Sequence, residues 1–247
     1  MSQPLITIVT VVLNDRNGIE RTLTSVVSQT FENRQHIVVD GQSTDGTVEF
    51  LREHRSKFDA LLSEPDCGIY DAMNKGLRLA AGDWLVFMNA GDAFASVDSL
   101  ALATVAISSD ADVVYSDVIF RRQHLDERIL CHHQLMRVHH QAIVYRKALH
   151  DRFGEYLVAK GVTISDYIFF NLIAGQRWVK IEQPIAICDV TGVTSRPMAY
   201  YQKLAVDLIF GVKKPHTVAL MLFLYPAYRL FLRPLVRLFR KRPKVSQ

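Results

Sequence analysis

Hydrophobic and polar positions follow two different periods along the first half of the chain. Short runs rich in β-branched residues predict strands at 5–13, 36–40, 60–63, 84–88 and 112–115. Between them, apolar residues recur at helical spacing in the segments 18–29, 46–54, 69–81 and 97–108. Strands that alternate with helices are typical of a mostly parallel sheet flanked by helices. The pattern therefore predicts a doubly wound α/β fold over this half.

The pattern is less regular from residue 117 to residue 195. It predicts a charged hairpin at 121–128, strands at 141–145 and 184–188, and a helix at 165–174. No linker rich in Pro, Gly or Ser separates this part from the first half, and no repeat occurs at any period. We therefore predict one domain over residues 1–207, in which residues 1–116 form one half and residues 117–207 the other.

Length and composition exclude several classes of protein. A chain of 247 residues with 49% apolar residues can bury a substantial core, which excludes disorder and small disulfide-stapled scaffolds. The three cysteines have no CxxC spacing, which favours a reducing compartment over a disulfide framework. The first residues, MSQPLITIVTVV, lack the basic segment and cleavage site of a signal peptide, so they are predicted as a strand.

Charge is distributed unevenly along the chain. The formal net charge is +4, but nine of the 29 Lys and Arg residues follow Asp207, and no acidic residue does. Residues 1–207 therefore hold 20 basic and 25 acidic groups, a net charge of −5. A nucleic-acid-binding fold is expected to present a basic face, so we predict no nucleic-acid partner.

The end of the chain combines basic and apolar residues. The apolar run 217–228 has 12 residues and contains Pro226, which is short of the ~20 residues that a spanning helix needs. Beyond it, Arg229, Arg233, Arg237 and Arg240 recur every three to four positions, with apolar residues between them. We predict that residues 208–247 form a basic amphipathic tail that lies on an anionic membrane surface. The alternative is a helix packed on the protein with its arginines in solvent.

Polar residues follow two of the predicted strands at the edge where open α/β sheets bind ligands. Asp40 ends the second strand and leads into a Gly-rich turn, so it could accept a hydrogen bond from a nucleobase or ribose, although ordinary turn chemistry also explains the segment. Asn89 and Asp92 follow the fourth strand, with Gly91 between them. A carboxylate there suits a divalent cation that bridges a diphosphate.

The segment before and within the third predicted helix is also rich in polar residues. Asp71 and Lys75 are four residues apart, which is the spacing of a surface ion pair. Asn74 lies among apolar helical positions, so its amide needs a partner and favours a structural or site-orienting role.

Four segments together resemble glycosyltransferase family 2, the inverting nucleotide-sugar transferases of the GT-A fold. They are the strand 6–14, VDGQSTDGT at 39–47, SEPDCGIYDAMNKG at 63–76 and LVFMNAGD at 85–92. The resemblance covers residues 4–195 and is nearest to bacterial enzymes that build exopolysaccharide or glycolipid, including colanic-acid-type transferases. Many relatives carry D-x-D-D where this chain has Asn89-Ala90-Gly91-Asp92, so Asp92 is the strong metal ligand that remains.

The resemblance implies roles for particular residues. A nucleotide-sugar donor carrying UDP, GDP or dTDP would bind in the first half, and Mg²⁺ or Mn²⁺ would bind at Asp92. An acidic residue that opens a helix in the second half would be the general base, and Asp166 matches it; otherwise Asp166 is a first-turn carboxylate favoured by the helix dipole. His140 would lie near the diphosphate or the acceptor, or it is a structural histidine. The implied donor-binding residues are Val11, Leu13, Asp40, Asp71, Asn74 and Asn89.

Other functions explain the sequence less well. A nicotinamide oxidoreductase needs G-x-G-x-x-G after the first strand, and the chain has none there. The spacing of Cys131, His132, His133, His139 and His140 fits no structural zinc site. A two-carboxylate glycoside hydrolase would leave the nucleotide-site pattern without a use. We expect a glycosyltransferase at the cytoplasmic face of a bacterial membrane, acting on a lipid-linked or growing glycan. The alternative is a catalytically weakened nucleotide-sugar-binding scaffold protein.

Overall fold

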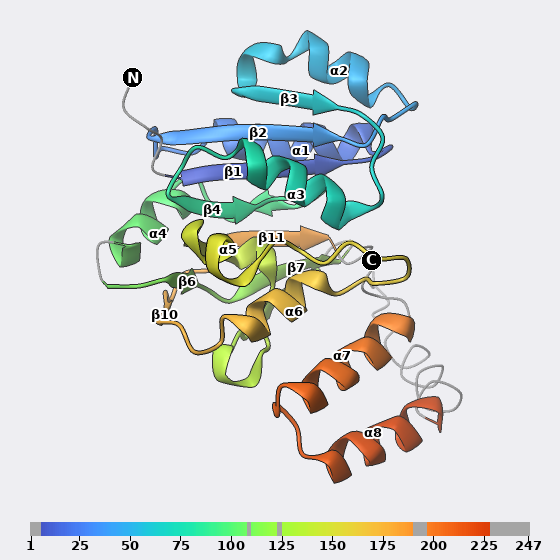
Figure 1. The fold of residues 1–247 in the computed structure, drawn as a ribbon. Helices are drawn as coiled ribbons and strands as arrows, with labels where there is room; N and C mark the ends of the chain where they lie inside the picture. The colour runs from blue at the N-terminus through green and yellow to red at the C-terminus, as the bar shows by residue number, and fades with distance from the viewer. Residues whose placement is uncertain (1–5, 108–109, 123–124, 190–196, 228–247) are drawn as a thin grey trace, which may run out of the picture. The chain divides into compact units, whose positions relative to one another are not determined.

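The computed structural model describes residues 6–107, 110–122, 125–189 and 197–227 (Figure 1). The chain divides into two compact units, residues 1–195 and residues 196–247, which are described separately. The domain boundary that we predict, after residue 207, falls near the end of a helix of the second unit. Residues 190–195, at the end of the family resemblance, lie outside the described residues.

The first unit is built on a seven-stranded sheet with the order β10-β6-β9-β4-β1-β2-β3. Its strands pair in parallel except β9, which runs antiparallel to both β4 and β6. This arrangement confirms the predicted mostly parallel α/β fold. In chain order the strands are β1 (Ile6–Val12), β2 (Arg34–Asp40), β3 (Ala60–Ser63), β4 (Trp84–Phe87), β6 (Val113–Tyr115), β9 (Ile143–Arg146) and β10 (Trp178–Lys180).

Helices cover both faces of this sheet, and Figure 1 shows α3 in front of the strands and α1 behind them. Alternate residues of β2 explain the two layers: Ile37 and Val39 pack in the cluster that contains α3, and Val38 packs in the cluster that contains α1 and α2. Gly76 allows α3 to approach the sheet closely, because a Cβ there would clash with Val9. The helices are α1 (Arg16–Val27), α2 (Thr47–Glu53), α3 (Ile69–Leu79), α4 (Ser99–Ile107), α5 (Ala148–Phe153) and α6 (Ser165–Leu172).

The first unit also contains a second sheet, which has four strands. Its order is β5 (Ala93–Phe94), β11 (Ala186–Asp189), β7 (Val118–Arg122) and β8 (Leu125–Ile129). β5 begins directly after Asp92, and β7 and β8 form the predicted charged hairpin. Three short 3₁₀ turns complete this unit: η1 (Arg55–Lys57), η2 (His133–Leu135) and η3 (His140–Ala142).

The described part of the second unit consists of α7 (Pro197–Ile209) and α8 (Pro215–Ala227). The rings of Tyr200 and Tyr225 stack with centroids 3.7 Å apart, and Lys213 pairs with Asp207. Pro226, which we expected to break the apolar run, lies inside the last turn of α8. Within the described ranges no helix has the length and apolar character needed to cross a bilayer. The recurring arginines from 229 onward lie outside the described residues.

Candidate active site

The register of the parallel strands brings Asp40 to the carboxyl edge of the sheet. Val12 pairs with Asp40, and Asp40 pairs with Ser63. The Asp40 side chain is fully buried; the Ser63 hydroxyl donates to its Oδ2 at 2.7 Å, and the Ser43 N–H donates to the same oxygen at 3.1 Å. The carboxylate therefore ties the loop after β2 to the end of β3.

The end of β1 forms the neighbouring part of this edge. Val11 is buried, whereas Leu13 is 55% exposed. Asn14 has a positive φ of 51°, and its Oδ1 accepts the Thr44 N–H at 2.8 Å. A Cβ at Gly41 would clash with the Asp66 carboxylate and crowd Leu13, so these three residues lie together. This edge therefore presents the exposed Leu13 side chain beside the tightly packed backbone at Gly41.

Asp71 and Asn74 of α3 are held by neighbours within the unit. Asp71 Oδ2 accepts the Cys67 N–H at 2.9 Å and lies 3.6 Å from Lys75 Nζ, which is the predicted surface pair. The Asn74 amide is buried and makes two bonds to the backbone of Tyr156: it donates to the carbonyl oxygen at 2.8 Å and accepts from the N–H at 3.0 Å. Asn74 therefore fixes the loop that precedes α6.

The turn after β4 carries Asp92 at the same sheet edge. The chain continues beside β1, because the Ala90 N–H donates to the Val11 carbonyl oxygen at 3.0 Å. The Thr22 hydroxyl donates to the Asp92 carbonyl oxygen at 2.6 Å, and Gly91 takes up a positive φ of 94°. Asp92 is only 7% exposed, and its Oδ2 accepts from Gln141 Nε2 at 2.8 Å.

A buried cysteine also contacts Asp92. Burial, and then the negative charge of Asp92 together with a hydrogen bond to it, raises the pKa of the Cys188 thiol well above its ordinary value. The thiol therefore stays protonated beside the carboxylate. Asp92 is thus held by side chains from η3 and β11, both in the second half of the unit.

Asp166, at the start of α6, lies in a continuous chain of side-chain contacts. The Tyr70 hydroxyl donates to its Oδ1 at 2.7 Å, and His140 Nδ1 lies 2.9 Å from its Oδ2. On the far side of the imidazole, His140 Nε2 lies 2.9 Å from Asn89 Nδ2. The Asn89 side-chain oxygen is buried and has no hydrogen-bond partner. The chain Tyr70–Asp166–His140–Asn89 thus joins α3, α6, η3 and the end of β4.

The charge state of Asp166 follows from these contacts. Burial alone would raise the pKa of its carboxyl group, but the hydrogen bond and charge interaction with His140, followed by the hydrogen bond from Tyr70, outweigh burial and lower the pKa from 3.8 to about 2. Burial and the neighbouring Asp166 charge raise the pKa of the Tyr70 hydroxyl, which keeps it a donor. Asp166 is therefore an ionised carboxylate throughout the neutral range.

A family model, described as glycosyl transferase family 2, matches residues 7–167. The chain belongs to this family. A stretch of 113 residues is 41% identical to an uncharacterised glycosyltransferase of Mycobacterium tuberculosis, covering 45% of this chain and 43% of that protein. A stretch of 168 residues is 33% identical to a PGL/p-HBAD biosynthesis glycosyltransferase of Mycobacterium bovis, covering 63% of this chain and 64% of that one. The family 2 chain therefore spans less than two thirds of the length of these relatives.

Solved glycosyltransferases share the fold of this family 2 protein. Residues 1–349 of S. aureus TarS, in complex with UDP-GlcNAc, match with a TM-score of 0.69 at 16% identity, covering 84% of this chain and 66% of that one. The mannosyltransferase PcManGT of Pyrobaculum calidifontis, in complex with GDP-Man and Mn²⁺, matches with a TM-score of 0.59 at 19% identity, covering 83% and 61%. The matches agree with the GT-A fold that the resemblance implies.

The structure of this family 2 protein brings together some of the residues singled out from the sequence. Asn89, His140 and Asp166 form one contact chain, while Asp92 is linked to it through the neighbouring Gln141. Three contacting residues were not singled out: Tyr70, Gln141 and Cys188. Gln141 stands next to His140 in the sequence, but nothing in the spacing pairs it with Asp92, which is 49 residues away.

Proposed function

We propose that this family 2 protein is an inverting glycosyltransferase. It transfers a sugar from a nucleoside diphosphate sugar to a lipid-linked or growing glycan acceptor of bacterial polysaccharide or glycolipid synthesis. The observation that carries the proposal is the contact chain from Tyr70 to Asn89, which lies next to the turn of Asp92 and holds an ionised carboxylate there. The M. bovis relative's name and the donors bound to the two solved structures support the substrate classes.

Asp166 is the general base in this proposal. The acceptor hydroxyl oxygen forms a bond to the anomeric carbon while the bond from that carbon to the diphosphate oxygen breaks. The hydroxyl proton passes to Asp166, and the nucleoside diphosphate leaves with the bonding electron pair. A single displacement of this kind inverts the anomeric centre. A carboxylate with a pKa of about 2 is a weak base, so it accepts the proton late, when the hydroxyl is already bonding to carbon.

Two oxygen donors at the end of β4 fit a hard divalent cation. Asp92 supplies a carboxylate, and the Asn89 side-chain oxygen is buried without a hydrogen-bond partner. Mg²⁺ commonly uses one or two carboxylates and completes its shell with water and substrate phosphates. Asp92 would hold Mg²⁺ or Mn²⁺ in this proposal. When bound, the cation would offset the charge that develops on the departing diphosphate.

The donor nucleotide is proposed to lie over the carboxyl edge of β1 and β2. Leu13 offers an exposed apolar surface there, and the lack of a side chain at Gly41 leaves room for the Asp66 carboxylate beside it. Asp40 is fully buried, so it acts on the nucleotide by holding the loop after β2 in place. Val11 and Asp71 support the same edge through β1 and the start of α3.

A ligand screen tests the enzymatic proposal. Thermal melting of the full chain is measured with UDP-, GDP- and dTDP-sugars, with and without Mn²⁺, and the stabilising donor is then assayed for release of its nucleoside diphosphate. We expect one nucleotide class to raise the melting temperature and its sugar to be released when Mn²⁺ is present. Failure of all three classes to bind would refute the donor proposal. Binding without any turnover would favour the scaffold alternative.

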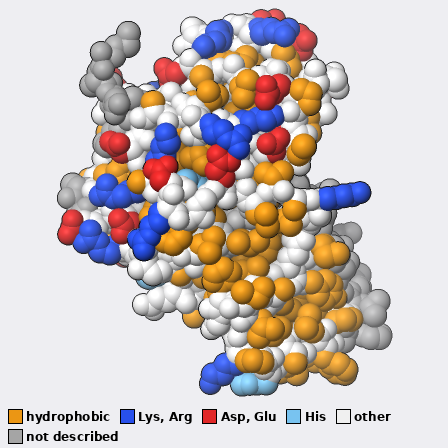
Figure 2. Space-filling view, viewed as in Figure 1, with side chains coloured by type: hydrophobic (Ala, Val, Ile, Leu, Met, Phe, Trp, Pro, Cys, Tyr) orange, Lys and Arg blue, Asp and Glu red, His pale blue; other side chains and the backbone are white. Residues whose placement is uncertain are grey.

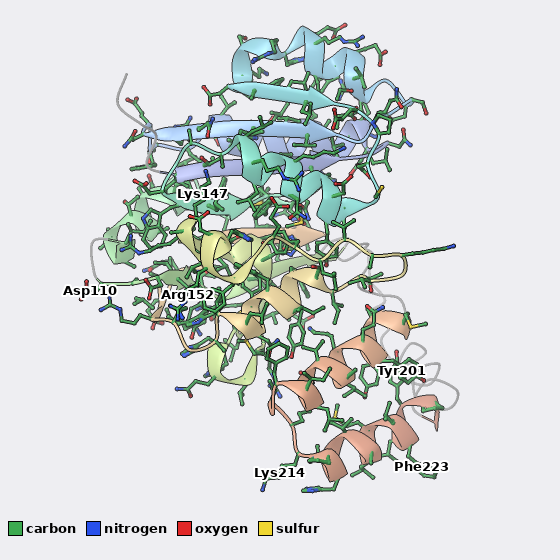
Figure 3. The ribbon with its side chains drawn as sticks, viewed as in Figure 1. Asp110, Lys147, Arg152, Tyr201, Lys214 and Phe223 are labelled. Atoms are coloured by element: carbon green, nitrogen blue, oxygen red, sulfur yellow. The ribbon has the colours of Figure 1, made fainter. Side chains whose placement is uncertain are left out.

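We also propose that the second unit lies on an anionic membrane at the cytoplasmic face. Figure 2 shows apolar side chains gathered over α7 and α8, and Figure 3 labels Lys214 at the start of α8 and Phe223 further along it. Phe223 is 80% exposed and Ile209 is 77% exposed. The sequence after Asp207 has nine basic residues and no acidic one, which suits anionic lipid. The free cysteines agree with a reducing compartment.

Vesicle sedimentation tests the membrane proposal. The full chain should bind vesicles that contain anionic lipid, bind neutral vesicles more weakly, and be released in part by salt. Phe223→Ser should weaken binding, whereas Val105→Ser, which changes a 73% exposed apolar residue of α4, should leave it unchanged. Equal binding by all three proteins would count against α8 as the contact, and no binding by the wild type would end the proposal.

A further inference from the structure

The turn η3 directs two consecutive side chains to two parts of the candidate active site. His140 contacts Asp166 and Asn89, and Gln141 contacts Asp92. The turn itself is fixed: the Ala142 N–H donates to the His139 carbonyl oxygen at 2.9 Å, and the Ala142 carbonyl oxygen accepts the Ser116 N–H at 3.0 Å. Ala142 is fully buried. A change in one of the two side chains can therefore be made without moving the other.

The contact from Gln141 determines how the Asp92 carboxylate is presented. The terminal torsion of an aspartate is soft, so the carboxylate rotates readily unless a donor holds it. Gln141 Nε2 donates to Oδ2 at 2.8 Å. A carboxylate oxygen has more than one lone pair, so Oδ2 can accept this amide and still face a ligand. The amide adds no charge to the site.

We propose that Gln141 is a positioning residue of the cation site, which orients Asp92 and keeps cation binding dependent on the donor diphosphate. This inference rests on the proposed function, since it requires Asp92 to hold the cation. Affinity for hard cations increases with the number of charged ligands. Within the described ranges, no group of three or more His, Cys, Asp or Glu side chains is placed to hold a metal ion. A site with one oriented carboxylate therefore needs the phosphates of the donor to complete it.

Mn²⁺ titration tests this role directly. Binding is measured by electron paramagnetic resonance for Mn²⁺ alone and for Mn²⁺ with UDP, GDP or dTDP. The wild type should bind Mn²⁺ more tightly when its nucleotide is present. Gln141→Met keeps the length of the side chain but donates no hydrogen bond, and it should lower the affinity measured with nucleotide by about 10-fold or more, as loss of a partner of a metal ligand does.

Gln141→Glu gives the opposite result if the inference is right. It places a second carboxylate beside Asp92, so Mn²⁺ alone should bind at least ~10-fold more tightly and the effect of the nucleotide should shrink. The matched control is Gln35→Met. The Gln35 side chain is likewise held by hydrogen bonds, with the Thr7 hydroxyl, the Ala81 N–H and the Leu79 carbonyl oxygen, but it lies near the amino end of β2, so Mn²⁺ affinity should not change.

The outcomes separate this inference from the proposed function. If the wild-type protein does not bind Mn²⁺ in the presence of any of the nucleotides, both the cation site and the role of Gln141 are refuted. If the wild type binds Mn²⁺ but both Gln141 variants behave like it, the cation site stands and the role of Gln141 falls. Failure of both variants to fold, while Gln35→Met melts near the wild-type temperature, would make Gln141 a residue of the core and would also overturn the inference.

Discussion

Replacing Asp166 by asparagine should remove the proposed base and leave the site intact. An asparagine has the same shape, so its oxygen can still accept from the Tyr70 hydroxyl, but its amide nitrogen cannot accept a hydrogen bond from His140 Nδ1 as the carboxylate oxygen does. It has no charge and takes no proton. Loss of a general base costs about 10²- to 10⁴-fold in rate, which corresponds to about 3–5 kcal/mol in the barrier. Donor affinity should stay near the wild-type value, because the base acts in the chemical step.

The same variant predicts a change in acid stability whose sign is fixed by the pKa. The carboxyl group of Asp166 has a lower pKa in the folded protein, about 2, than its ordinary value of 3.8. It therefore stabilises the folded state above pH 4, and this contribution is lost as the pH falls from about 4 to 2. The shift corresponds to about 2 kcal/mol of unfolding free energy. The free energy of the wild type minus that of Asp166→Asn should fall by about this amount over that range.

Three measurements decide the matter: donor affinity by calorimetry, kcat at saturating donor, and urea unfolding from pH 2 to pH 6. Asp126→Asn is the control, since Asp126 is an exposed carboxylate that pairs with Arg121 on the β7–β8 hairpin, and it should keep the wild-type rate. An Asp166→Asn enzyme with weakened donor binding and preserved kcat would place Asp166 in the donor site. Because the pKa is about 2, ionisation of Asp166 should not limit the wild-type rate between pH 5 and 8.

Three further substitutions probe the neighbouring residues. Asp92→Ala should abolish transfer and remove the Mn²⁺ dependence of donor binding, and near-wild-type turnover would refute the cation assignment. Asp40→Ala should weaken nucleotide binding by calorimetry and also lower stability, because two donors lose their acceptor; unchanged affinity would count against its role. Asn74→Ala leaves the Tyr156 N–H and carbonyl oxygen without partners, so urea unfolding should show a loss of about 2–4 kcal/mol. Unchanged stability would mean that water replaces the amide.

The first half of the fold could be predicted because its signals are local. Buried strands such as β1 and β2 are continuous apolar runs, and the amphipathic spacing of α1 and α3 is visible in short windows. The predicted helix and strand ends differ from those observed by only a few residues. The position of Asp40 and of the turn after β4 at one edge follows from parallel topology alone.

The second half depends on contacts between distant segments. β5 and β10 have two and three residues, too few to show a period, and they exist because β11 and β6 pair with them. The helix α5 has six residues and was not predicted. β9 was predicted as a strand, but its antiparallel insertion between β4 and β6 was not, because strand direction is a property of the sheet. Short elements of this kind are stabilised by packing more than by propensity.

The candidate site also combines local sequence signals with contacts between distant segments. Tyr70 and Asp166 are 96 residues apart, and Asn89 and His140 are 51 residues apart, so no spacing rule pairs them. The resemblance nevertheless singled out three of these four residues, because motif segments mark where chemistry lies even when they do not reveal which side chains meet. The second half of the first unit contributes directly to the candidate site, since η3, α6 and β11 supply contacts to the turn after β4 and to Tyr70.

The departure from the acidic family motif at Asn89 has a chemical reason in these contacts. Asp166 only accepts hydrogen bonds, so the proton of a neutral His140 ring lies on Nδ1, and Nε2 is left as an acceptor. An amide at position 89 can donate to that nitrogen at 2.9 Å, whereas a carboxylate could pair with it only if the ring carried a proton on both nitrogens. An aspartate at position 89 would therefore place His140 between two negative charges. With asparagine at position 89, each of the two η3 side chains contacts one carboxylate. Gln141 contacts Asp92 in the turn after β4, and His140 contacts Asp166 at the start of α6.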